Sequence, residues 1–254
     1  MTRLLRSIAL AAATLCLAGN ALALEIKVLS AGAIKPVIAA ALPEFEQRTG
    51  HKVTIENDTA GGLARRVRAG EKFDLLVMPV QGLQQLAGEG AVSAAGLQPL
   101  AKVGIGVAVK QGMPAPNIAT TADFRAALLA ARKVAYIDPA AGGSSGIYLA
   151  QLFERMGIAP QIQAKAVLVP GGLVAQRLLN GEADLAVHQI SEILAVPGAT
   201  LVGPIPAEVQ NYTVYAMALP ATAGSAAEAA RQLLAELAGA PLRARLAAFG
   251  MEAP

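Results

Sequence analysis

Small polar residues and glycines follow four apolar runs of this sequence, at points where a strand is expected to lead into a helix. They are Ser30-Ala31-Gly32-Ala33, Thr59-Ala60-Gly61-Gly62, Gly142-Gly143-Ser144-Ser145-Gly146 and Pro170-Gly171-Gly172. Small side chains leave the first N–H groups of a helix uncovered at the positive end of its dipole, which suits an anion. One such turn is common in any protein, whereas four in one chain predict an anionic ligand held by several helix starts.

Three titratable residues accompany these turns. Arg65 and Arg66 begin a helix beside the glycine turn at 61–62, and at least one of them is expected to pair with the anion. His188 ends an apolar strand, where a histidine is either a hydrogen-bonded structural residue or a group facing the ligand cleft. The only other histidine, His51, fits a surface turn, and the sequence offers no close acidic or cysteine cluster for a metal.

The segment at 142–146 also has the G-x-S-x-G spacing of a hydrolase nucleophile elbow. With Ser144 as nucleophile, Asp184 and His188 follow in the order of a triad. However, four residues separate the strand from Gly142, whereas an elbow is a sharp turn, and Asp184 and His188 flank one short strand. Helix capping by Ser144 and Ser145 is the simpler interpretation. No G-K-[ST] follows any glycine turn, so no nucleotide cofactor is expected.

These side chains must be positioned by alternating strands and helices. The expected strands are residues 25–29, 52–56, 73–78, 104–110, 133–137, 164–169, 183–188 and 212–219. The expected helices are residues 34–48, 63–69, 83–87, 121–131, 146–156, 173–179, 226–237 and 241–249. This alternation of apolar strands with helices predicts an α/β fold, with mainly parallel sheets covered by helices on both faces.

Two segments are candidates for crossing between two lobes. They are residues 103–110 and the proline-rich stretch at 203–206 that leads into residues 211–219. The prediction is one discontinuous lobe of residues 24–105 and 206–254, and a second lobe of residues 106–205. The ligand cleft would lie between the lobes and close about this hinge.

The N-terminus and the overall composition limit location and partners. Arg3 and Arg6, an apolar stretch at 8–18 and Ala21-Leu22-Ala23 predict a signal peptide of residues 1–23 that directs export to the periplasm. Its removal takes the only cysteine, Cys16, and lowers the formal net charge from +3 to +1. With 4% aromatic residues and no basic block, nucleic acid is not an expected partner, and no later apolar run is long enough to insert stably in a membrane.

Four segments carry a resemblance to a known family. KVLSAGA at 27–33, GGLARRV at 61–67, AGEKFDLLV at 69–77 and GEADLAV at 181–187 resemble the molybdate-binding receptors of ABC transporters. The resemblance implies a two-lobed type II periplasmic binding protein. It places the two serine ligands of the family on Ala33 and Ala60, its binding helix start near Ser144 and Ser145, and its tyrosine on His188. The same branch of the fold includes an exported aconitate isomerase.

We therefore expect an exported protein that captures a small anion for an ABC permease, without a cofactor or metal. The expected ligand-binding residues are Gly32, Ala33, Thr59, Ala60, Gly61, Arg65, Ser144, Ser145, Gly172 and His188. Alanine at 33 and 60 removes two hydroxyl donors, which favours an organic carboxylate over molybdate. The alternative is a periplasmic isomerase of a small polycarboxylate, with His188 as its base. A hydrolase using Ser144 is the third hypothesis.

Overall fold

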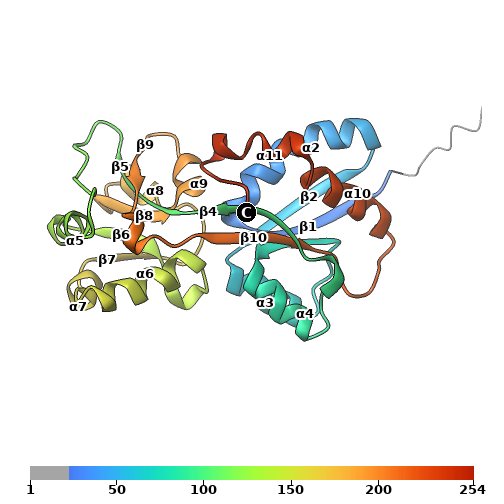
Figure 1. The fold of residues 1–254 in the computed structure, drawn as a ribbon, viewed down its shortest axis with the longest axis horizontal. Coiled ribbons are helices and arrows are strands. Elements are labelled where there is room, and N and C mark those ends of the chain that lie inside the picture. The colour runs from blue at the N-terminus through green and yellow to red at the C-terminus, as the bar shows by residue number, and fades with distance from the viewer. Residues whose placement is uncertain (1–22) are drawn as a thin grey trace, which may run out of the picture.

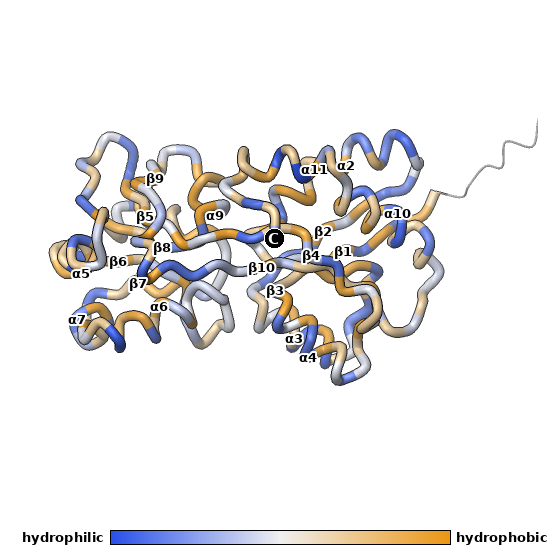
Figure 2. Tube along the Cα trace, in the orientation of Figure 1, coloured by the Kyte–Doolittle hydropathy of each residue, from blue (hydrophilic) through white to orange (hydrophobic). Residues whose placement is uncertain are grey.

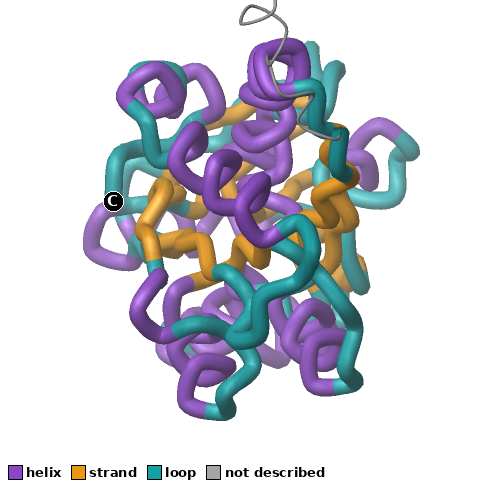
Figure 3. The backbone as a smooth tube through the Cα atoms, turned by 90° about the vertical axis from the view of Figure 1, so that its right-hand side faces the viewer, coloured by secondary structure: helices purple, strands orange, loops and turns teal. Residues whose placement is uncertain are grey.

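Residues 23–254 are described by the computed structural model, and they form two α/β lobes side by side (Figure 1). The predicted signal peptide lies outside the described residues, apart from Ala23. Within residues 23–254, none of the helices combines the length and the apolar character that a membrane crossing requires. Viewed along the long axis, helices flank the strands on opposite sides (Figure 3). The predicted fold class is confirmed.

The first sheet contains five strands. They are β1 (Glu25–Ala31), β2 (Lys52–Asp58), β3 (Leu75–Pro79), β4 (Gln98–Val103) and β10 (Thr213–Ala218). Their order is β2-β1-β3-β10-β4, with β10 antiparallel to both of its neighbours and the other pairs parallel. The associated helices are α2 (Lys35–Thr49), α3 (Ala60–Arg68), α4 (Val80–Gly88), α10 (Ala227–Leu237) and α11 (Ala240–Arg243).

The second sheet has the same number of strands. They are β5 (Ile105–Lys110), β6 (Val134–Ile137), β7 (Ala166–Val169), β8 (Leu185–Gln189) and β9 (Ala199–Pro204), in the order β7-β6-β8-β5-β9. Its helices are α5 (Thr121–Ala130), α6 (Ser144–Arg155), α7 (Ala159–Gln163), α8 (Gln176–Leu179) and α9 (Ile190–Leu194). Short 3-10 turns occur at Gly32–Ile34, Ala94–Gly96, Pro139–Ala141, Ala207–Val209 and Leu246–Phe249.

The hydrophobic core follows these two sheets. One buried cluster surrounds the first sheet, and two smaller clusters cover the two faces of the second. Phe45 and Tyr215 anchor the first cluster, and Phe124 and Phe153 pack within the second lobe. Hydrophobic residues gather along the strands, while hydrophilic residues concentrate on the outer helices (Figure 2).

The chain changes sheet at two places. The first is Gly104, between β4 and β5, and the second lies between Pro204 and Thr213. Gln210 joins them, because its side chain accepts from Ile105 N–H at 2.8 Å and donates to Ile105 O at 2.9 Å. The predicted lobe limits at 105/106 and 205/206 stay a prediction. If the two lobes move relative to each other, these two linked connections are the expected hinge.

Several expected elements need correction. Strands β4 and β9 were not predicted, because both lie at sheet edges and contain a proline, Pro99 or Pro204, which sheets tolerate at their edges. The short helices α7 and α9 were also missed. The helix expected at 173–179 spans only Gln176–Leu179, and the one expected at 241–249 is divided into α11 and a 3-10 turn.

Candidate functional site

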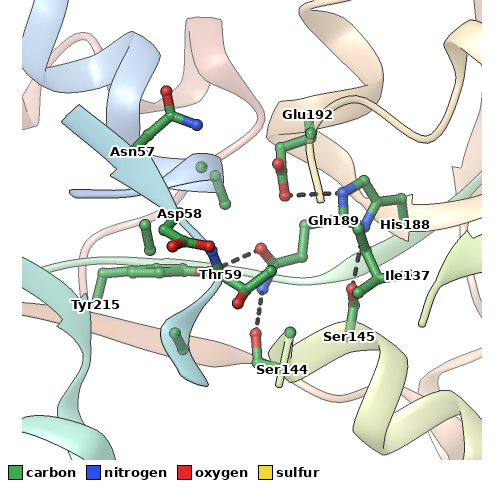
Figure 4. Close-up of a pocket in the computed structure, with 16 residues that line it drawn as sticks. Asn57, Asp58, Thr59, Ile137, Ser144, Ser145, His188, Gln189, Glu192 and Tyr215 are labelled. Carbon is green, nitrogen blue, oxygen red and sulfur yellow. Dashed lines mark hydrogen bonds and ion pairs between the residues drawn. The ribbon is translucent and has the colours of Figure 1, made fainter. Parts of the chain in front are cut away.

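A small cavity lies where the two lobes meet. It is lined by Ala31, Gly32, Ala33, Asn57, Asp58, Thr59, Ala60, Ile137, Gly143, Ser144, Ser145, Gly172, His188, Gln189, Glu192 and Tyr215. These residues come from the ends of strands and starts of helices in both lobes (Figure 4). The cavity volume is about 40 Å³, which is room for about three water molecules. The two lobes therefore meet around a small central space.

Eight of the ten residues expected to bind ligand line this cavity. They are Gly32, Ala33, Thr59, Ala60, Ser144, Ser145, Gly172 and His188. The first N–H groups of a helix have no acceptor within that helix. Donors are therefore present at this end of the sheets at the starts of three helices: α2 with its preceding 3-10 turn, α3 and α6. The structure thus brings the strand-to-helix turns of both lobes together, although their role in binding stays a proposal.

Gly61 lies between the lobes but does not line the cavity. Its N–H donates to Gly142 O at 3.0 Å, across the lobe interface. A Cβ at Gly61 would lie 2.8 Å from Gly142 Cα, and Gly142 itself has a φ of 80°. Thr59 adds a second contact, since its hydroxyl donates to Ala141 O at 2.6 Å. Glycine at both positions permits this close approach of the two lobes. The Gly61 N–H is already bonded to Gly142 O and is not available to a ligand in this arrangement.

The two arginines also lie off the cavity. Arg65 is exposed, more than one helical turn from the cavity-facing start of α3. Arg66 instead forms ion pairs with Glu56 and Glu71, and Glu71 also pairs with Lys27. These contacts engage Nε and Nη2 of Arg66. Neither arginine lines the cavity, and the expected role of Arg65 in holding a ligand stays a prediction.

The Glu71 contacts predict an acid-sensitive contribution to stability. Arg66 and Lys27 hold the pKa of Glu71 at about 2, below its ordinary value of 4.5. Because the folded pKa is the lower one, this stabilisation is present above about pH 4.5 and is lost as the pH falls to about 2. Urea unfolding is expected to show wild type more stable than Glu71→Gln near neutral pH, with the difference shrinking over that interval. A difference that is constant with pH contradicts this.

The cavity wall on the second lobe contains a buried acid and base. His188, at 3% exposure, is the next-to-last residue of β8, and Glu192, at 7% exposure, lies in the first turn of α9. Their Nε2 and Oε2 atoms are 2.9 Å apart. His188 Nδ1 is 3.0 Å from Ser145 Oγ at the start of α6. A chain of three polar side chains therefore runs along this wall (Figure 4).

The contact between His188 and Glu192 is an ion-pair distance without the alignment of a hydrogen bond. Within residues 23–254, Nε2 has no hydrogen-bond partner, although it is buried. A buried polar atom without a partner costs stability, and such groups concentrate at functional sites. The His188 ring therefore retains an unmet hydrogen-bonding capacity beside the cavity.

Gln189 connects the lobes beneath the cavity. Its Nε2 donates to Ser144 Oγ at 3.2 Å and to Thr213 Oγ1 at 3.0 Å, and its Oε1 accepts from Tyr215 at 2.7 Å. Burial raises the pKa of Tyr215 above its ordinary value, so the phenol stays protonated and donates. Gln189 lies on β8, whereas Thr213 and Tyr215 lie on β10, so this network fixes the relative position of the two sheets.

The triad of Ser144, Asp184 and His188 that the hydrolase hypothesis required is not assembled in the structure. Asp184 bonds the backbone N–H and guanidinium of Arg132, at 2.9 and 2.6 Å. It directly precedes β8, in which His188 is the next-to-last residue, so the strand itself separates the two side chains. His188 contacts Ser145, and Ser144 bonds Gln189 instead.

Five polar cavity residues were not predicted from the sequence. They are Asn57, Asp58, Gln189, Glu192 and Tyr215. The sequence could have indicated Glu192, because it is the only Asp, Glu, Lys or Arg between Asp184 and Glu208. An isolated acid in such a stretch indicates burial with a specific partner. Asn57, Asp58 and Gln189 lie at the ends of strands, Tyr215 lies within β10, and none of the four has a distinguishing pattern.

The charge of the cavity wall is unusual for an anion site. It contains two acids, Asp58 and Glu192, and no lysine or arginine among the described residues. Asp58 accepts from Thr59 N–H at 2.7 Å beside the start of α3, where a negative charge is stabilised. Glu192 has His188 as its counterpart. Each acid thus has local compensation, and the helix starts remain the donors for a ligand.

Comparison with known proteins supplies the family. Residues 26–252 match the model for bacterial extracellular solute-binding proteins. An aconitate isomerase of a Pseudomonas species is 36% identical over 219 residues, which cover 84% of this chain and 82% of that protein.

Two solved structures are similar in fold. The periplasmic molybdate-binding protein of Azotobacter vinelandii has a TM-score of 0.75 at 19% identity, over 90% of this chain and 99% of its own. The sulfate-binding protein of Mycobacterium tuberculosis has a TM-score of 0.70 at 18% identity, over 90% of this chain and 86% of its own. At these identities the likeness concerns the fold alone. The family match covers nearly all of the described residues, and the chain belongs to the bacterial extracellular solute-binding protein family.

Proposed function

We propose that this protein binds a small organic polycarboxylate between its lobes and isomerises it by moving a proton from one carbon to another. The observation that carries the proposal is the buried His188–Glu192 pair, 2.9 Å apart in the cavity wall. Capture of a ligand needs donors, whereas a buried acid–base pair facing the ligand is suited to proton transfer. The 36% identity to an aconitate isomerase supports aconitate as the substrate.

The reaction needs no co-reactant. A base removes a proton from the methylene carbon of the substrate, and the electron pair of that C–H bond delocalises over the neighbouring double bond and carboxylate. The proton then returns at the far carbon of the three-carbon unit, so the double bond moves and the atom count is unchanged. The amide donors of the helix starts hold the substrate carboxylates and stabilise the negative charge as it develops.

The cavity leaves little free space for a six-carbon tricarboxylate. At about 40 Å³ it accommodates only a few water-sized groups. Substrate entry therefore requires the lobes to separate at the connections near Gly104 and between Pro204 and Thr213. Contacts across the interface, such as Gly61 N–H to Gly142 O, then re-form around the bound acid.

Capture of a small anion for an ABC permease in the periplasm is the second candidate function. The family match favours it, and the helix starts around the cavity can hold an oxyanion or a carboxylate without any catalysis. In this function the signal peptide directs export, the lobes close on the ligand, and the closed form docks on the permease.

Incubation of the mature chain, residues 24–254, with trans-aconitate distinguishes the candidates. Proton NMR is expected to show cis-aconitate forming in proportion to protein concentration, with none in a protein-free control. Calorimetry on the same sample measures binding. Aconitate that binds without turnover supports the receptor, and submicromolar molybdate binding with no aconitate binding overturns the isomerase proposal.

A further inference from the structure

The Glu192 carboxylate lies where both lobes meet. Its Oε2 atom faces His188 of the same lobe at 2.9 Å. Its Oε1 atom lies against Gly32 of the opposite lobe, where a Cβ would be only 2.6 Å away. Gly32 therefore leaves the space that this carboxylate occupies. Figure 4 shows Glu192 directed toward the centre of the cavity, with Asp58 and Thr59 on the opposite side.

The two nitrogens of His188 are both directed at protein groups. Nδ1 is 3.0 Å from Ser145 Oγ, and Nε2 faces Glu192. With its proton on Nε2, the ring accepts from the Ser145 hydroxyl at Nδ1, and Nε2 lies at ion-pair distance from the Glu192 carboxylate. The imidazole would have to leave one of these partners to reach a substrate carbon. It is better placed to hold the Glu192 carboxylate than to act on the substrate.

Asp58 and Tyr215, the other ionisable groups of the cavity besides His188, each have a hydrogen-bond partner. Asp58 accepts from the Thr59 N–H at 2.7 Å beside the start of α3. Tyr215, with its raised pKa, donates to Gln189 at 2.7 Å. By contrast, Glu192 Oε2 faces His188 Nε2 at 2.9 Å, and Oε1 lies against Gly32 of the opposite lobe. Glu192 is therefore the acid of the cavity whose carboxylate lies between a buried base and the opposite lobe.

We infer that Glu192 is the catalytic residue that removes and returns the substrate proton, and that His188 and Ser145 position it. The inference rests on the proposed isomerase function. Oε1 takes the proton of the methylene C–H bond, and the released electron pair spreads over the allylic carbons and the adjacent carboxylate. The new O–H bond of Glu192 then breaks as its proton returns to the far carbon. One carboxyl group acts as base and then as acid, and the enzyme ends as it began.

Glu192→Gln tests this assignment, because glutamine has the same size but does not accept the proton. Turnover of trans-aconitate measured by NMR is expected to fall by about 10² to 10⁴, the usual contribution of a general acid–base group. The dissociation constant from calorimetry is expected to stay within about threefold, because the amide still fits against Gly32. Exchange of the methylene hydrogens in D₂O is expected to disappear with turnover. Glu154→Gln, an exposed change on α6, is the matched control and is expected to retain full activity.

The outcomes separate the two proposals. Wild-type protein that binds aconitate without turnover overturns both the isomerase function and the role of Glu192. Wild-type turnover with a Glu192→Gln variant that stays within tenfold of it overturns this inference alone. If the glutamine variant does not fold, Glu192→Asp replaces it: the carboxylate remains but is withdrawn by one methylene, and a loss of about 10²-fold is expected from the misplacement. Undiminished turnover of a folded aspartate variant then contradicts the assignment.

Discussion

Replacing His188 by alanine is expected to slow isomerisation about 10²-fold, the loss associated with a misplacement of about 1 Å at a reacting centre. The imidazole separates Ser145 from Glu192 and contacts both, at 3.0 and 2.9 Å. Without it, the Glu192 carboxylate is free to turn away from the substrate, and Ser145 loses its partner. Turnover of trans-aconitate followed by NMR gives the rate, and a thermal melt establishes that the variant is folded.

His188→Gln distinguishes positioning from direct proton transfer. A glutamine amide can direct an N–H toward Glu192 from near the place of Nε2, so this variant is expected to recover at least part of the activity. The imidazole is itself the base if both His188 variants are inactive while Glu192→Gln retains turnover. That result would support the role for His188 that the sequence suggested.

Replacing Gln189 by leucine is expected to destabilise the protein by about 2–4 kcal/mol, because buried polar groups lose their partners at about 1–3 kcal/mol each. Gln189 is 2% exposed. The hydroxyls of Ser144, Thr213 and Tyr215 would all lose the amide that joins them. Urea unfolding measures the free-energy difference directly.

A surface change provides the control for this effect. Gln161 is exposed on α7, and Gln161→Leu is expected to stay within about 0.5 kcal/mol of wild type. If the free energy of unfolding of Gln189→Leu also stays within about 1 kcal/mol of wild type, the interlobe network does not contribute as described. Aconitate affinity in the leucine variant reports separately on closure, because the network spans β8 and β10.

The sequence predicted the turns of the cavity well because they depend on local backbone chemistry. A strand followed by small residues and a helix places N–H groups at one edge of a sheet whatever surrounds it. The turns at Gly32, Thr59, Ser144 and Gly172 were found in this way. The same reasoning did not show that Arg65 lies off the cavity, because its distance from the cavity depends on how far along the helix it lies.

Residues that depend on long-range packing were not predictable. Gln189 acquires its role only when β8 meets β10, and 24 residues separate it from Thr213. Glu192 lies on a five-residue helix too short to show a periodic pattern. Its pairing with His188 requires a strand to end and a helix to begin within four residues. Spacing alone does not distinguish that geometry from a continuous strand.

The place of β10 in the first sheet determines the order in which the chain can fold. β10 lies between β3 and β4, yet it follows all five strands of the second sheet. Residues 105–204 form the second sheet without a break, so that lobe can fold as soon as it has been synthesised. Until residue 218 is available, β3 lacks a neighbour on one side and β4 has no strand partner among those described. Unpaired strand edges invite association with other chains. Insertion of β10 is therefore expected to be a late step of folding, and the first lobe exposes unpaired strand edges until it occurs.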